Sequence, residues 1–231
     1  MRFRLISAAT LCAGLGALAM FRTATSATPE PDLFLSVRVH IVQSGTSHLQ
    51  GDRSLQDNQL EQRFERINEA FAPTGIQWQL ESVRPHRIHS STAWNTAVRS
   101  GEVRDRGRAF SSIAEGANML HPRGVDVFVV RDLSPVGLDG AYKCALASQQ
   151  RRPAVFIGNE TSKGTPMPHR KWAHELGHVL GLKHPDCEPE LGNRLMMSGA
   201  CSHAQRGRIY LSPEEVETMR TQAERGVPPG C

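Results

Sequence analysis

The apolar positions of this chain change their spacing along the sequence, which predicts strands and helices in alternation. Residues 34–42 alternate in character and are rich in branched side chains, so we expect a strand there. Residues 55–72 carry an apolar side chain at every third or fourth position, which predicts an amphipathic helix ended by Pro73-Thr74-Gly75. A second strand is predicted over residues 76–83.

The rest of the chain continues this alternation. The apolar run 125–130 suits a buried strand. Residues 142–147 are expected to form an edge strand and residues 154–158 another. Residues 168–180 are predicted to be helical. A last helix begins at Ser212-Pro213-Glu214-Glu215, which supplies a serine cap, a proline at the first position and a capping-box glutamate.

The order of these elements predicts one domain of mixed helices and strands, with a long insertion between its second and third strands. Residues 28–231, roughly 200 residues, are an ordinary size for a single domain. The insertion, residues 84–120, has a helical pattern interrupted by glycine and a charged run at Arg104-Asp105-Arg106. We interpret it as a solvated helical segment that covers the sheet, and the alternative is an element of substrate specificity.

The segment 174–184 carries the most specific chemistry in the chain. Positions four apart lie on one face of a helix, so His174 and His178 project together. Gly181 can adopt a positive φ and end the helix, after which His184 can return to the same point from a loop. These three imidazoles have the spacing of ligands to one Zn²⁺ ion. The alternative is an amphipathic helix with surface histidines, which leaves the position of Gly181 unexplained.

The number of ligands indicates which kind of zinc site this would be. Three protein nitrogens leave the fourth tetrahedral position open to water, as in catalytic rather than structural zinc sites. Glu175 follows the first ligand and is predicted to be a general base beside the metal rather than a ligand. The other histidines show no ligand spacing, and we interpret them as surface or packed side chains.

The chain resembles the metzincin clan of zinc metallopeptidases in two places. Residues 174–184 are similar to the zinc-binding consensus of that clan, and residues 193–199 to the methionine-containing turn beneath its metal. Within that turn Met196 matches best, and Met197 is the alternative. The resemblance implies an α+β fold with a twisted, mostly parallel five-stranded sheet and an antiparallel edge strand. It also implies an upper subdomain over 28–181, and an irregular lower subdomain over 182–231 that ends in a helix.

The subfamily stays open, and so do finer features of the site. Pro185 is shared with serralysins, whose glycine- and aspartate-rich repeats are absent here, and residues 67–78 weakly resemble pappalysin-like enzymes. The resemblance points to residues 138–142 as the strand edge along which an extended substrate would pair. Tyr210 is a distant candidate for stabilising the oxyanion, against an ordinary half-buried tyrosine, because Ser198 stands where some relatives place a tyrosine.

Residues 1–27 have the pattern of a secretory signal peptide, with a basic start, an apolar stretch and a small-residue cleavage site. The catalytic domain is then expected over 28–231, in a secreted or periplasmic monomer without a membrane anchor. A retained N-terminal anchor is the alternative. Loss of the signal would leave 24 basic against 23 acidic side chains, which gives no electrostatic case for binding nucleic acid.

Four cysteines follow the predicted signal, an even number that suits disulfides in an exported chain. They allow three pairings. We favour Cys187–Cys201, which would close the loop before the methionine turn, together with Cys144–Cys231. Cys187 as a zinc ligand is the competing interpretation.

The sequence thus predicts a secreted zinc endopeptidase that acts on a protein or peptide substrate. Two alternatives remain. One is a secreted binding protein in which zinc only stabilises the fold, and the other is a zinc amidase acting on a non-protein amide.

Overall fold

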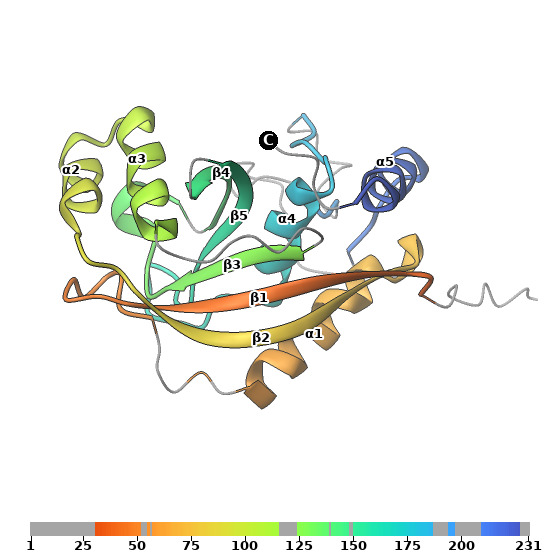
Figure 1. Ribbon diagram of the computed structural model, residues 1–231. Helices are drawn as coiled ribbons and strands as arrows, with labels where there is room; N and C mark the ends of the chain where they lie inside the picture. Colours follow the sequence, from red (N-terminus) through yellow and green to blue (C-terminus); the bar gives the residue numbers. More distant parts are fainter. Residues whose placement is uncertain are drawn as a thin grey trace, which may run out of the picture.

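The structure is a computed structural model that describes most of the chain between residues 31 and 226 (Figure 1). The described residues are 31–51, 55, 57–115, 124–138, 140–147, 150–186, 194–196 and 209–226. The predicted signal peptide, residues 1–27, lies outside them, and so do Cys187, Cys201, Cys231 and Met197. The two favoured disulfides therefore stay predictions. No helix within the described residues is long and apolar enough to cross a membrane.

A five-stranded, mostly parallel sheet forms the centre of the molecule, as predicted. Its spatial order is β2-β1-β3-β5-β4. The first four of these, β2 (Ile76–Arg87), β1 (Leu33–Gln43), β3 (Gly124–Val130) and β5 (Gln150–Gly158), are parallel to one another. The fifth, β4 (Gly140–Ala147), pairs antiparallel with β5 and forms the edge of the sheet.

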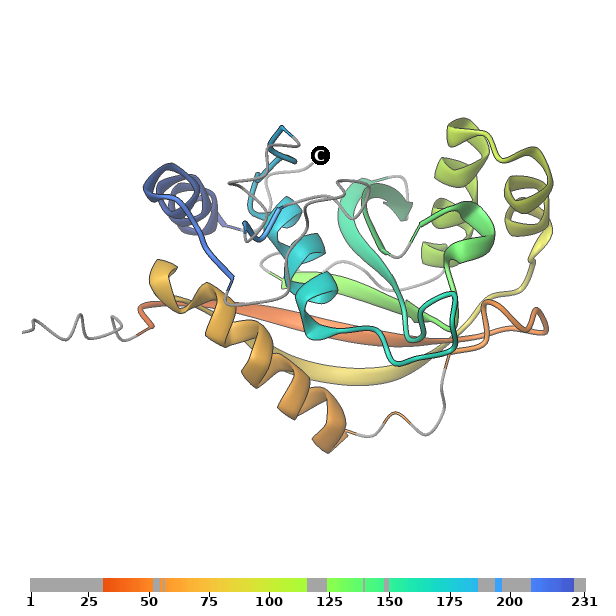
Figure 2. The same cartoon turned by 180° about the vertical axis from the view of Figure 1, so that it is seen from behind.

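Helices cover both faces of this sheet. On one face lie α1 (Asp57–Phe71) and α4 (His169–Val179), which Figure 2 shows side by side. On the other face lie α2 (Thr92–Ser100) and α3 (Val103–Ala114), which bury Trp94 and Phe110 against strand residues that include Phe128 and Phe156. The helical part of the insertion therefore covers the sheet, and each large side chain buried there contributes about 1.5–3 kcal/mol.

Two strand predictions need correction. The second strand runs on to Arg87, beyond the predicted end at Val83, because residues 40–43 of β1 continue to pair with residues 84–87. Pro85 is tolerated there because β2 is an edge strand, where a missing N–H need not break the ladder. The strand predicted over 154–158 as a second edge is instead internal, since β5 lies between β3 and β4.

The C-terminal part is described over residues 182–186, 194–196 and 209–226. Its last helix, α5 (Pro213–Glu224), begins with the predicted capping box, in which Ser212 Oγ accepts from the backbone N–H of Glu215 and the Glu215 side chain accepts from that of Ser212. Figure 1 shows α5 at the opposite end of the molecule from α2 and α3, with α4 between them.

Candidate metal centre

Helix α4 carries two of the predicted metal ligands and the predicted base. It ends at Val179, and Gly181 adopts a φ of 84°, a left-handed conformation that favours glycine. The chain therefore turns back as the sequence predicted. His184 returns on the following segment to meet the helix.

The three predicted ligands converge on one point. His184 Nε2 lies 2.9 Å from His174 Nε2 and 3.1 Å from His178 Nε2. Among the described residues, this triad is the group of three whose side-chain atoms are placed to hold a metal ion. His174 is buried, His178 is partly buried and His184 is exposed, so the cluster opens toward solvent on the His184 side.

Backbone carbonyl groups fix the tautomers of the two helical histidines. His174 Nδ1 lies 3.0 Å from the carbonyl oxygen of Leu195, and His178 Nδ1 lies 2.8 Å from that of Leu182. A carbonyl oxygen only accepts, so each Nδ1 must donate its hydrogen. In a neutral ring the Nε2 atom then carries a lone pair, and both lone pairs point toward His184.

This arrangement fits a cation better than hydrogen bonds among the rings. His184 Nε2 carries at most one hydrogen and cannot satisfy two lone pairs at once. A tetrahedral zinc ion with Zn–N bonds of about 2.0–2.1 Å holds its nitrogen ligands roughly 3.3 Å apart, close to the separations seen here. Burial lowers the pKa of His174 to about 4, which keeps this ring in its neutral, ligating form at neutral pH.

Glu175 lies beside the triad and against the start of the edge strand. Its side chain is buried, with 6% of its surface exposed. A methyl group built on Gly140 would lie 2.8 Å from Glu175 Oε1, closer than nonbonded atoms approach. Glycine at this position therefore allows β4 to pass directly next to the carboxylate, within the segment 138–142 that the resemblance indicated.

Met196 lies beneath the helix that carries the ligands. The residue is fully buried, and a methyl group built on Gly177 would lie 2.7 Å from its Sδ atom. Gly177 stands between His174 and His178 in sequence, so the thioether packs against the part of α4 that carries these two histidines. Its assignment to a metzincin methionine turn stays a prediction.

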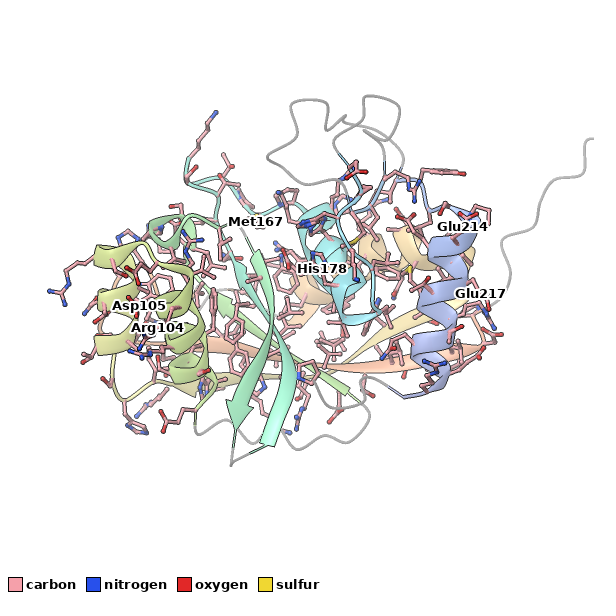
Figure 3. The ribbon with its side chains drawn as sticks, turned by 90° about the horizontal axis from the view of Figure 1, so that it is seen from above. Arg104, Asp105, Met167, His178, Glu214 and Glu217 are labelled. Atoms are coloured by element: carbon pink, nitrogen blue, oxygen red, sulfur yellow. The ribbon has the colours of Figure 1, made fainter. Side chains whose placement is uncertain are left out.

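The charged run of the insertion lies apart from this centre, and Tyr210 has its side chain at the surface. Figure 3 shows Arg104 and Asp105 on the α2–α3 side of the molecule, well away from His178 on α4. The Tyr210 side chain is 55% exposed and lies beneath the Arg194 guanidinium, whose carbon is 5.8 Å from the ring centre. The oxyanion role considered for this tyrosine stays a prediction.

Sequence reasoning missed the groups that support the triad. The carbonyl groups of Leu182 and Leu195 are backbone atoms, and every residue type supplies one, so the sequence carries no signal for them. Gly140 could have been noticed only as a glycine at the start of a predicted edge strand.

Comparison with known proteins supports a metalloprotease. No family model matches the chain. The chain is 30% identical over 169 residues to a protein of Pyricularia oryzae named extracellular metalloprotease, an alignment that covers 69% of this chain. The chain spans about half of that relative, 53% of its length. The name of this distant relative and the histidine triad together fit a zinc metalloprotease.

Proposed function

We propose that this chain is a zinc-dependent endopeptidase of the metzincin type, with His174, His178 and His184 as zinc ligands and Glu175 as general base. The observation that carries the proposal is the convergence of the three Nε2 atoms, two of them with lone pairs fixed by backbone carbonyl groups. The name of the Pyricularia oryzae relative agrees with this activity.

The chemistry follows from the positions of the chain's own side chains. A zinc ion bound by the three imidazoles would polarise a substrate carbonyl and lower the pKa of a water molecule in the fourth position. Glu175 would accept a proton from the water whose oxygen adds to the carbonyl carbon, and would return it to the amine nitrogen as the C–N bond breaks. Because the Glu175 carboxylate is buried, bulk water competes little for this proton.

The edge strand β4 would orient an extended substrate across the site. An extended peptide that pairs main chain to main chain with the outer edge of β4 would pass close to Glu175, because Gly140 lies against that carboxylate. Main-chain pairing is independent of side-chain identity, which suits an endopeptidase. We further propose a monomeric protein, secreted or periplasmic, with a protein or peptide as substrate and no role in binding nucleic acid.

Metal removal and restoration test this proposal. The purified protein is incubated with a denatured protein substrate before and after a chelator, and again after stoichiometric zinc is returned. We expect cleavage that the chelator abolishes and zinc restores, while His178→Ala stays inactive throughout. Tight stoichiometric zinc binding without cleavage would instead support the zinc-stabilised binding protein. Cleavage restricted to non-protein amides would support the amidase.

The same preparation defines specificity. Digestion of a peptide library, read by mass spectrometry, would give the residues preferred around the cleaved bond. Glu175→Ala run alongside the wild-type protein identifies any contaminating protease, because its products would appear in both digests.

A further inference from the structure

Arg194 connects the last helix of the molecule to the imidazole of His174. We infer that Arg194, held by Glu215, is a positioning residue that orients His174 for metal binding. The inference rests on the proposed zinc site, and it concerns residues that touch neither the metal nor the substrate. It is carried by a continuous series of contacts from α5 to the triad.

The first part of the series is the backbone around residues 194 and 195. The carbonyl oxygen of Leu195 accepts from His174 Nδ1 at 3.0 Å. The peptide group that precedes it is held at both of its polar atoms. Its carbonyl oxygen, on Arg194, accepts from Arg170 Nη2 at 2.7 Å, and its N–H, on Leu195, donates to the carbonyl oxygen of Tyr210 at 3.2 Å. The orientation of this backbone therefore sets the direction of the bond to His174.

The second part is the Arg194 side chain. Its Nε and Nη2 atoms pair with the two carboxylate oxygens of Glu215 at 2.9 and 2.8 Å, and Nη2 also donates to Ser212 Oγ at 3.1 Å. This two-pronged geometry is available to arginine and not to lysine. The side chains of Arg194 and Glu215 are only 17% and 11% exposed.

Burial distinguishes this pair from an ordinary surface ion pair. Arg66 and Glu69, for comparison, form a contact of 2.8 Å with side chains that are 64% and 62% exposed. Exposed ion pairs of that kind contribute little to the stability of the fold. Glu215 is also fixed by the capping box of α5, so the carboxylate that holds Arg194 is itself immobile. The series thus runs from a rigid helix start, through Arg194 and the Leu195 carbonyl, to the buried ligand.

The test measures metal affinity separately from activity. Arg194→Met removes the forked contact while keeping an unbranched apolar stem in place of the arginine methylenes. Glu215→Gln keeps a side chain that can complete the capping box but removes its charge. We expect each variant to weaken zinc binding by about 10-fold to 100-fold, the range typical of residues that support metal ligands. Arg194→Lys, which restores the charge without the fork, should recover only part of the loss.

Competition with a chromophoric chelator gives the affinity, and the visible absorption of cobalt(II) in the site reports ligand geometry. The matched control is Arg220→Gln, which also loosens α5 by removing the bonds from Arg220 to Asp32 and to the Thr74 carbonyl. We expect this control to lower the melting temperature and leave zinc affinity and the cobalt spectrum unchanged.

The outcomes separate this inference from the proposed function. Wild-type affinity and spectrum in both Arg194→Met and Glu215→Gln would overturn the inference, and so would an equal loss of affinity in Arg220→Gln. If Arg194→Met does not fold, Glu215→Gln and Arg194→Lys still decide the question. A wild-type protein that binds no zinc would instead refute the proposed function.

Discussion

Two polar clusters in this molecule differ in how their hydrogen-bond donors and acceptors are matched. The first lies on the face of the sheet that α2 and α3 cover, where the two carboxylate oxygens of Asp126 meet Arg38 Nη2 at 2.8 Å and His40 Nε2 at 2.7 Å. Asp126 is 2% exposed, and its charge is compensated within the cluster. The second is the His174–His178–His184 triad, in which three Nε2 atoms face one another and the one hydrogen that His184 Nε2 could carry cannot serve the lone pairs of both other rings.

The difference teaches how a structural cluster and a ligand site can be told apart. In the Asp126 cluster both carboxylate oxygens meet donors and the imidazole of His40 stacks on Phe128 with ring centres 4.7 Å apart, while Arg38 Nε is buried without a hydrogen-bond partner. The triad instead brings three ring nitrogens to one point, an arrangement that could hold a cation. Breaking the first cluster should therefore damage folding, and breaking the second should damage metal binding and catalysis.

Glu175→Gln should give the largest effect. Loss of the general base is expected to lower kcat/KM by about 10²-fold to 10⁴-fold, while zinc affinity and melting temperature stay near wild-type values. Peptide hydrolysis, chelator competition and thermal unfolding on the same preparation check this. Activity above a tenth of the wild-type rate in zinc-loaded Glu175→Gln would contradict the role of this carboxylate.

Asp126→Ala should give the opposite pattern. It leaves Arg38 buried without its carboxylate, and we expect a loss of about 3–5 kcal/mol in the free energy of unfolding, measured in urea. Zinc affinity of the folded protein should not change. Glu69→Ala, which breaks the exposed pair with Arg66, is the control and should cost less than about 1 kcal/mol. Similar losses in the two variants would show that the Asp126 cluster is not a buried structural element.

Zinc itself should stabilise the fold through the triad alone. At a free zinc concentration 100 times its Kd, the wild-type free energy of unfolding should rise by about 2.7 kcal/mol over the chelated protein. His184→Ala should lose this increment, and Asp126→Asn should keep it. Urea unfolding with and without zinc measures both. An equal increment in His184→Ala would place the ion elsewhere.

Gly140→Ala should reduce turnover without removing the metal. The added methyl group would collide with the Glu175 carboxylate, and we expect kcat to fall by about 10-fold, since small displacements of catalytic groups are costly. Gly107→Ala on α3 is the control, because a methyl group there meets no atom within 4 Å. Equal kcat values for the two variants would refute the close approach of β4 to Glu175.

The smallest effect concerns pH and His86. Nε2 of this ring donates to the carbonyl oxygen of Ile113 at 2.6 Å, and burial lowers the pKa of His86 below its ordinary value of 6.5. The unfolded chain therefore binds a proton more readily than the folded chain, and stability should fall as the pH drops below 6.5. In His86→Gln the decline between pH 7 and pH 5 should be shallower. Parallel urea titrations would detect this, and an unchanged slope would contradict it.

Local patterns predicted the parts of this molecule that depend on neighbouring residues in sequence. The convergence of His174, His178 and His184 was predictable because the first two lie four residues apart on α4 and Gly181 follows the end of that helix. The capping box of α5 was predictable for the same reason. The internal position of β5 was missed because the order of strands in a sheet depends on distant pairing. The extension of β2 through Pro85 was missed because only its edge position permits it.

The supporting contacts of the site were also missed because they join residues that are distant in the sequence. His174 depends on a carbonyl group 21 residues away, and the Arg194–Glu215 pair spans the same separation. Such contacts are made by folding, and a single sequence gives their partners no common spacing. The sequence therefore predicted which imidazoles converge, but not what holds them in place.

The unequal exposure of the three imidazoles predicts the order in which they would release a bound ion. His174 is enclosed by the protein and tied to Leu195, whereas His184 faces solvent on a segment beyond the helix. Metal exchange should accordingly start with release of His184, and an incoming chelator would attack from that side while α4 still holds the ion. The rate of metal loss would then depend on the chain after Gly181, which carries His184. The affinity for the ion would depend more on His174 and His178 on α4.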